Sequence, residues 1–255
     1  MKKRLDVVLV ERGLTESREK AQALILSGKV MVDGQKATKA GHAIAASARV
    51  EVSEPLKYVS RGGLKLEAAL AGFGVSAAGR VCLDVGTSTG GFTDCLLQHG
   101  AARVHAVDTG AGQIDWKLRT DARVVLHERV NARYLSKDEI GEAVSLLVCD
   151  VSFISVTLLI PAMIPLVDPG GDWIILVKPQ FEAGREFVER GGIVRDPAGH
   201  RFACERVSGA MRAVGFEVAL RESPILGGEG NREFLLHARR RTDAHSPVAA
   251  GTAGG

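Results

Sequence analysis

A chain of 255 residues, 45% of them hydrophobic and with a net charge of +3, is long enough for one or two globular domains. The longest apolar runs are too short to span a bilayer and we expect no signal peptide, which argues against a membrane-spanning or secreted protein. The four cysteines lie far apart without C-x-x-C or zinc spacing, so we expect buried free thiols, no bound metal and a cytoplasmic location.

The N-terminal part of the chain is predicted to be a small basic module. Residues 1–61 carry 12 Lys and Arg against 7 Asp and Glu. Apolar spacing and capping residues predict helices over Leu5–Arg12 and Arg18–Ser27. A hairpin at Asp33-Gly34 and a strand over Ala48–Val52 are predicted to follow. The excess of positive charge indicates a polyanionic partner, with a solvated charged face as the simpler alternative.

A strand, a glycine-rich turn and a helix are predicted over Val81–Gly100, which begins VCLDVGTSTGGFTD. The spacing differs from the dinucleotide fingerprint, because Ser88 stands where the middle glycine would be, and no phosphate-binding lysine follows Gly91. Asp84 at the end of the strand suits a cationic ligand such as S-adenosylmethionine better than a pyrophosphate. An ordinary tight turn between strand and helix is the alternative interpretation.

The next predicted strand, within Ala102–Gly110, ends on Asp108. An acid at this distance from a glycine turn is placed to accept hydrogen bonds from a ribose diol, although many strands end on an Asp that only caps the next helix.

Strands and helices alternate over the rest of the chain. Strands are predicted over Ser145–Asp150, DWIILV, FEVALRES and REFLLHARR, and helices over SRGGLKLEAALAGFG, Ile154–Leu166 and Gly199–Val214. This order predicts an α/β fold with a Rossmann-like, doubly wound sheet, mostly parallel with an antiparallel last strand, beside a small α+β N-terminal domain. We expect domains at residues 1–54 and 61–241, a linker at 55–60 and a disordered tail at 242–255.

Four charged residues are expected at or near the ligand-binding edge of this sheet: Lys65, Asp150, Lys178 and Glu233. Each alone has a simpler explanation, because strand ends are commonly solvated and charged. Together they fit transfer of a methyl group to a ribose 2′-hydroxyl, which requires a base for a weakly acidic alcohol. A lysine can serve if its pKa falls well below the usual value of about 10.4, and two carboxylates can hold the two lysines in place.

The stretch SREKAQALILSGKVMVDG resembles the small RNA-binding domain with the alpha-L motif, which occurs in a ribosomal protein and in pseudouridine synthases. The order Lys-Asp-Lys-Glu resembles the catalytic tetrad of the FtsJ-like RNA 2′-O-ribose methyltransferases. From Lys3 to Arg240 the chain is similar to the hemolysin A (TlyA) family of rRNA cytidine 2′-O-methyltransferases. The similarity is carried by the motifs SRGGLKLE, CDVSFIS, VKPQFE and NREFLL. The resemblance implies a methyltransferase sheet, S-adenosylmethionine as cofactor and ribosomal RNA or a ribosomal subunit as partner.

The resemblance also implies roles for single residues. Lys178 would accept the 2′-hydroxyl proton, with Lys65, Asp150 and Glu233 positioning it and the ribose. The implied cofactor-binding residues are Asp84, Gly86, Ser88, Gly90, Gly91, Phe92, Asp108 and Asn131. The implied RNA-binding residues are Arg4, Arg18, Lys20, Lys29 and Arg61. Phe92 has the alternative role of a core aromatic beneath the turn. The family further suggests that the linker at Lys57–Arg61 couples RNA docking to cofactor binding.

The family has shorter and longer forms, and the short stretch before the first predicted helix resembles the shorter form, which implies RNA of the large subunit as the substrate. The target nucleotide is expected to be flipped out. A membrane-active hemolysin is a competing class, although the sequence shows no apolar or strongly amphipathic segment for it. An RNA-binding regulator with an inactive methyltransferase domain is another, against which the intact tetrad argues. A small-molecule methyltransferase would leave the basic module unexplained.

Overall fold

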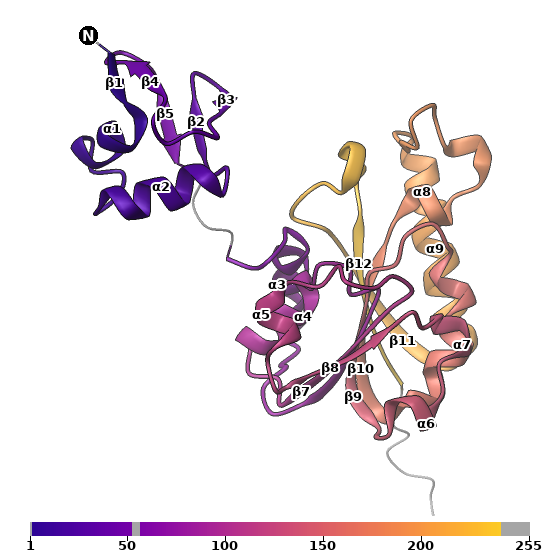
Figure 1. Cartoon of the computed structure of the whole chain (residues 1–255). Helices are drawn as coiled ribbons and strands as arrows, with labels where there is room; N and C mark the ends of the chain where they lie inside the picture. The colour runs from indigo at the N-terminus through magenta and orange to yellow at the C-terminus, as the bar shows by residue number, and fades with distance from the viewer. Residues whose placement is uncertain (1, 53–56, 241–255) are drawn as a thin grey trace, which may run out of the picture. The chain divides into compact units, whose positions relative to one another are not determined.

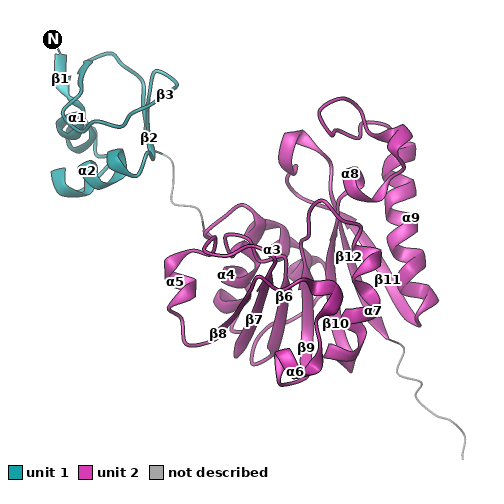
Figure 2. Ribbon diagram, turned by 45° about the vertical axis from the view of Figure 1, so that its right-hand side comes forward, with its two compact units in different colours: residues 1–56 teal, residues 57–255 magenta. Residues whose placement is uncertain are grey.

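The computed structural model, shown in Figure 1, describes residues 2–52 and 57–240. The chain divides into two compact units, residues 1–56 and 57–255 (Figure 2), and each has its own apolar core. The predicted tail at 242–255 and the first two residues of the predicted linker lie outside the described residues.

The described residues of unit 1, 2–52, form two helices and two small sheets that share one core. Leu5 and Leu9 from the first helix and Ala21 and Ile25 from the second are fully buried in it. One sheet pairs β1 with β4, and the other has the order β3-β2-β5. The elements are β1 (Lys2–Arg4), α1 (Leu5–Glu11), α2 (Arg18–Leu26), β2 (Val30–Val32), β3 (Gln35–Lys36), β4 (Ala43–Ala45) and β5 (Val50–Val52).

The predicted helices and hairpin of unit 1 are present, and each helix ends one residue before its predicted end. Asp33 and Gly34 have φ of 50° and 79°, the left-handed conformation that a two-residue hairpin turn of type I′ requires at both positions. The pairing of β1 with β4 was not predicted, because Lys2–Arg4 is an exposed and wholly polar strand that gives no alternating pattern.

Unit 2 is built on a seven-stranded sheet with the order β11-β12-β10-β9-β6-β7-β8. All neighbouring pairs are parallel except those of β12, which runs antiparallel to both β10 and β11, so the predicted antiparallel last strand is confirmed. The strands are β6 (Val81–Val85), β7 (Arg103–Asp108), β8 (Val124–Glu128), β9 (Val144–Cys149), β10 (Val167–Val177), β11 (Phe216–Glu222) and β12 (Phe234–Arg240).

Helices cover both faces of this sheet (Figures 1 and 2). Along β9, Leu146 and Val148 face the core beneath α3 and α4, whereas Leu147 and Cys149 face the core beneath α7 and α9. This alternation explains why the central strands have near-continuous apolar sequences. The helices are α3 (Gly62–Phe73), α4 (Gly91–Gln98), α5 (Trp116–Arg119), α6 (Lys137–Ile140), α7 (Ile160–Met163), α8 (Pro179–Glu182) and α9 (Pro197–Ala213), with short 3₁₀ turns η1 (Ala132–Tyr134), η2 (Val156–Leu158), η3 (Ile164–Leu166), η4 (Arg185–Phe187) and η5 (Gly228–Gly230).

The prediction of a single helix over Ile154–Leu166 is wrong. Three short pieces, η2, α7 and η3, occupy this stretch. Pro161 and Pro165 each lie at the start of a piece, because a proline lacks the backbone donor that a continuing helix needs and clashes with the preceding turn. Apolar spacing alone did not reveal this division.

The end of the predicted linker packs into unit 2. Tyr58 is 1% exposed, and a Cβ at Gly63 would overlap its ring. The backbone N–H of Val59 donates to Asp94 Oδ2 at 2.8 Å, and Gln98 Nε2 donates to the carbonyl of Lys57 at 3.0 Å. Residues 57–60 are therefore fixed against α3 and α4.

Candidate active site

The carboxyl ends of β6, β7, β9 and β10 lie at one edge of the sheet, because these strands are parallel. β6 has β7 on one side and β9 on the other, so the direction of winding reverses at β6. Ligands of open α/β sheets bind at such a reversal, outside the carboxyl ends of the strands.

The turn after β6 lies against the end of β9. Gly86 has φ of 87°, and a Cβ there would lie 2.4 Å from the carbonyl oxygen of Asp150. Ser88 also has a left-handed backbone, with φ of 51°, and its N–H donates to Asp108 Oδ2 at 2.7 Å. Asp108 Oδ1 accepts from the N–H of Gly110 at 2.7 Å. The Asp108 carboxylate therefore joins the turn after β6 to the end of β7.

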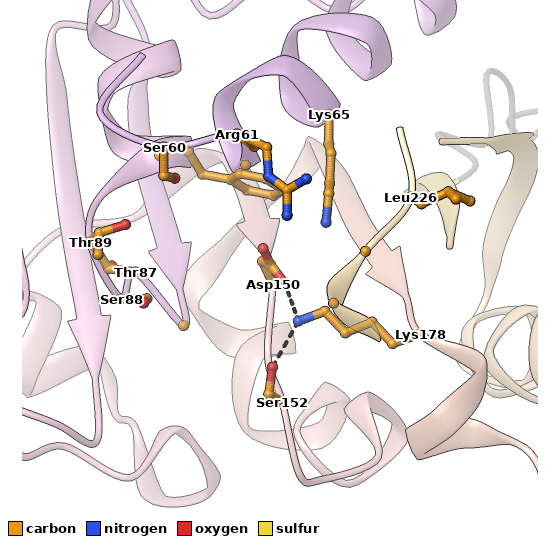
Figure 3. Close-up of a pocket in the computed structure, with 16 residues that line it drawn as sticks. Ser60, Arg61, Lys65, Thr87, Ser88, Thr89, Asp150, Ser152, Lys178 and Leu226 are labelled. Carbon is orange, nitrogen blue, oxygen red and sulfur yellow. Dashed lines mark hydrogen bonds and ion pairs between the residues drawn. The ribbon is translucent and has the colours of Figure 1, made fainter. Parts of the chain in front are cut away.

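Two cavities open at this edge of the sheet. The β7 cavity, of about 320 Å³, is lined by residues that follow β6, β7, β8 and β9, including Asp108, Asn131 and Phe153. The α3 cavity, of about 290 Å³, is lined by residues from the start of α3, the end of β10 and the loop before β12 (Figure 3). Both cavities are lined by Gly86, Ser88, Asp150 and Ser152, which form a shared wall.

Lys178 and Asp150 form an ion pair in the α3 cavity. Lys178 Nζ lies 2.6 Å from Asp150 Oδ1 and donates to Ser152 Oγ at 2.8 Å, and both contacts are drawn in Figure 3. The side chain of Lys178 is 12% exposed and that of Asp150 is 22% exposed. A nearly buried amine thus lies at the wall between the two cavities, with an acid and a hydroxyl fixing its position.

Lys65 and Glu233 form a second ion pair. Lys65 lies near the start of α3 and lines the α3 cavity, and its amine donates to Glu233 Oε2. Both side chains are nearly buried, and Glu233 lines neither cavity. The register pairs Val177 with Phe234, which places Lys178 and Glu233 at the same edge of the sheet. Tertiary structure thus brings all four predicted residues to this edge.

Asp84 is fully buried and lines neither cavity. Its Oδ2 accepts from Thr93 Oγ1 at 2.6 Å, and its Oδ1 has no hydrogen-bond partner among the described residues. Burial raises the pKa of Asp84 to about 7, the hydrogen bond from Thr93 opposes this shift, and the negative charges of Asp150 and Asp108 add to it.

Some of the other residues predicted to bind the cofactor around the turn line a cavity, and others are packed into the core. Gly90 lines neither cavity, and a Cβ there would lie 2.3 Å from Leu118. Gly91 and Phe92 line the α3 cavity, not the β7 cavity. Phe92 is 3% exposed and belongs to the core beneath α3 and α4. Asn131 lines the β7 cavity, and its side chain accepts from the N–H of Arg133 at 3.0 Å.

Three of the predicted RNA-binding residues of unit 1 already have ionic partners there. Arg4 and Arg18 both contact the buried carboxylate of Asp6. These contacts, that of Arg4 above all, hold the pKa of Asp6 well below its usual range. Lys20 pairs with Glu16, and Lys29 is partly exposed. Arg61, in unit 2, lines the α3 cavity.

Sequence reasoning missed Ser152 and Phe153. Phe153 is 92% exposed, has φ of 66° and lies in the wall of the β7 cavity, with its ring centroid 5.3 Å from that of Phe181. A left-handed phenylalanine is a strained backbone, and such strain gathers at functional sites. The motif CDVSFIS contained both residues, but only the fold shows that Ser152 lies in the shared wall and Phe153 in the wall of the β7 cavity.

The chain was compared with known proteins. Residues 58–240 match FtsJ-like methyltransferase, and residues 3–50 match the S4 domain. Over 243 residues the chain is 44% identical to the 16S/23S rRNA (cytidine-2′-O)-methyltransferase TlyA of Mycobacterium tuberculosis, covering 94% of this chain and 91% of that protein. It is 35% identical over 182 residues to the 23S rRNA (cytidine-2′-O)-methyltransferase TlyA of Campylobacter jejuni, covering 71% and 70%. A candidate hemolysin from Streptococcus thermophilus has a solved structure with a TM-score of 0.73 and 44% identity, covering 94% of this chain and 89% of that chain.

The mixed seven-stranded sheet and the FtsJ match define an S-adenosylmethionine-dependent methyltransferase. The chain belongs to the hemolysin A (TlyA) family, in which an S4 RNA-binding domain precedes an FtsJ-like methyltransferase domain. Within the described residues, no helix is both long and apolar enough to cross a membrane.

The residues of the β7 cavity fit this cofactor. The absence of a side chain at Gly86 opens the turn beside Asp150. Each oxygen of Asp108 accepts one N–H and retains a lone pair for a ribose hydroxyl. Asp108 and Asp150 are the charged residues that line this cavity, and carboxylates suit a sulfonium cation.

Proposed function

We propose that the chain transfers a methyl group from S-adenosylmethionine to the 2′-hydroxyl of a cytidine in ribosomal RNA. One observation carries this proposal: the two cavities share a wall, and Lys178 is held beside it by Asp150 and Ser152. A cofactor in the β7 cavity and a ribose in the α3 cavity would meet at that wall. Ribosomal RNA and cytidine enter the proposal from the names of the two relatives.

Bound S-adenosylmethionine supplies an activated methyl group, so the chain has to align the hydroxyl and remove one proton. We assign proton removal to the amine of Lys178, oriented by Asp150 and Ser152. Lys65, oriented by Glu233, would donate a hydrogen bond to the ribose. Asp108 and Asn131 would hold the cofactor in the β7 cavity, and Asp84 would support the turn from beneath through Thr93.

The RNA contacts are assigned to the S4 domain and to the mouth of the α3 cavity. Arg4, Arg18, Lys20 and Lys29 would contact phosphates from unit 1, and Arg61 would do so at the cavity. Flipping of the target nucleotide would present its 2′-hydroxyl to Lys178. We propose RNA of the large subunit as the substrate, since both relatives act on 23S rRNA and only one of them also acts on 16S rRNA. Such a substrate would place the protein in the cytoplasm.

The test is transfer of labelled methyl groups from S-adenosylmethionine to purified large subunits, small subunits and naked rRNA, followed by nucleoside analysis. We expect 2′-O-methylcytidine in large-subunit RNA, and none with Lys178→Ala. Label on small subunits as well would refute the restriction to the large subunit. No label on any RNA, despite cofactor binding, would refute the proposal in favour of a regulatory or small-molecule role.

A further inference from the structure

Glu182, the last residue of α8, is a buried carboxylate that lines neither cavity. It is 2% exposed. Its Oε2 accepts from Ser155 Oγ at 2.6 Å, and its Oε1 accepts from the backbone N–H of Val156 at 2.7 Å. Burial raises the pKa of Glu182, and the hydrogen bonds from Ser155 and Val156 oppose that shift. Two neighbouring donors therefore satisfy both oxygens of one buried acid.

These hydrogen bonds join the same two segments that meet at Lys178. Residues 150–156 follow β9, and residues 178–182 follow β10. At one end the segments are held by Lys178 with Asp150 and Ser152, and at the other by Glu182 with Ser155 and Val156. The two segments are thus fixed to each other at both ends.

The segment that Glu182 holds is not stable by its own geometry. Phe153, in its middle, has the strained left-handed backbone and is almost fully exposed. A strained residue persists only where its surroundings fix it. Arg206 of α9 donates to the carbonyl oxygen of Glu182 at 3.0 Å and so ties α8 to the long helix. Glu182 thereby connects the strained segment to the rigid part of unit 2.

We propose that Glu182 is a positioning residue that holds residues 150–156 against α8, so that Asp150 and Ser152 stay at the Lys178 amine and the shared wall keeps its shape. The proposal rests on the proposed function for its effect on turnover. It also predicts an effect on cofactor binding, because residues 151–154 line the β7 cavity. Mutation of the partners that orient metal ligands from behind commonly lowers activity by about 10- to 100-fold, and we expect an effect of similar size here.

The two hydrogen bonds of Glu182 allow a conservative variant. In Glu182→Gln the amide oxygen can accept from Val156, and the amide nitrogen can donate to Ser155 Oγ. Ser155 can then direct its own proton to Thr157 Oγ1, which lies 2.7 Å away. Glu182→Met fills a similar volume without either hydrogen bond. Ser155→Ala removes one of the two.

Asp172 provides a matched control. It is a buried carboxylate in the middle of β10, where it accepts from Arg80 and His237, each at 2.8 Å, and it lines neither cavity. Asp172→Ala therefore removes a comparable buried acid without touching the site. A loss of activity that follows from lower stability alone would appear in this variant too.

The experiment measures kcat on rRNA, the Kd for S-adenosylmethionine by calorimetry and Tm for the full chain and each variant. For Glu182→Met we expect kcat to fall at least about tenfold and the cofactor Kd to rise about fivefold. Glu182→Gln and Asp172→Ala should stay within about twofold of wild type in both, and Ser155→Ala should be intermediate. The proposal is overturned if Glu182→Met keeps wild-type kcat and Kd, if Asp172→Ala loses as much, or if Glu182→Gln is as impaired as Glu182→Met while folded. If the wild type methylates no RNA, the proposed function fails, and the pattern of cofactor Kd values alone decides the role of Glu182.

Discussion

Lys65 and Glu233 form a buried ion pair although they lie 168 positions apart in the chain. The pair joins the first helix of unit 2 to the residue before its last strand. Removing one partner of a buried pair leaves an uncompensated charge, whereas replacing both by apolar residues removes the desolvation penalty. Stability and activity should therefore respond differently to single and double substitutions.

Glu233→Ala is expected to lower the free energy of unfolding by about 3–5 kcal/mol, because the amine of Lys65 loses its partner. The double variant Lys65→Met with Glu233→Leu is expected to regain most of that stability and still lack methyl transfer. Urea unfolding and the labelled-methyl assay measure the two effects. A double variant as unstable as the single one would contradict the explanation through an unpaired charge.

Lys178→Ala is expected to lower kcat by about 10²- to 10⁴-fold, because it removes the assigned base. Lys178→Arg should be nearly as inactive, since a guanidinium stays protonated and cannot accept the hydroxyl proton. Cofactor affinity, measured by calorimetry, should fall much less than kcat, because Lys178 contacts Asp150 and Ser152 of the shared wall but does not itself line the β7 cavity. An active arginine variant would rule out Lys178 as the base.

Gly86→Ala is expected to abolish measurable binding of S-adenosylmethionine, because the new Cβ would overlap the carbonyl of Asp150 at the shared wall. Gly79→Ala is the control. Gly79 also has a positive φ, 71°, but a Cβ there meets no atom within 4 Å. Both substitutions carry the left-handed cost of about 1–2 kcal/mol, so this cost does not distinguish them. Equal cofactor affinity in the two variants would show that crowding at Gly86 is unimportant.

Asp84 should make the stability of unit 2 depend on pH. Its folded pKa of about 7 lies above the unfolded value of about 3.9, so the folded protein holds a proton that the unfolded chain releases. The contribution of Asp84 to stability is present below about pH 4 and is lost as pH rises to about 7. Asp84→Asn lacks this titration, so from pH 4 to 8 its stability should rise relative to wild type by on the order of 4 kcal/mol. A constant difference across this range, in denaturant unfolding, would refute the assignment.

Much of the fold followed from local patterns. Hydrophobic periodicity and turn residues, which act over a few residues, predicted the apolar strands, the Asp-Gly hairpin and the long helix α9. The division of Ile154–Leu166 did not follow from apolar spacing, although Pro161 and Pro165 signalled it. The β1–β4 pair depends on contacts between segments about forty residues apart, which no local pattern encodes.

The candidate site likewise has features that follow from the sequence and features that only the tertiary structure decides. The sequence alone determined the residue types and their order: a glycine turn after a strand that carries Asp84, Asp108 at the end of the next strand, and the series Lys65, Asp150, Lys178 and Glu233. Only the tertiary structure decided which of them meet. It pairs Lys178 with Asp150 and Lys65 with Glu233, buries Asp84 behind the turn, and adds Ser152 to the shared wall. The physical reason is that a parallel sheet gathers strand ends from distant parts of the chain at one edge, where register and packing set the distances between side chains.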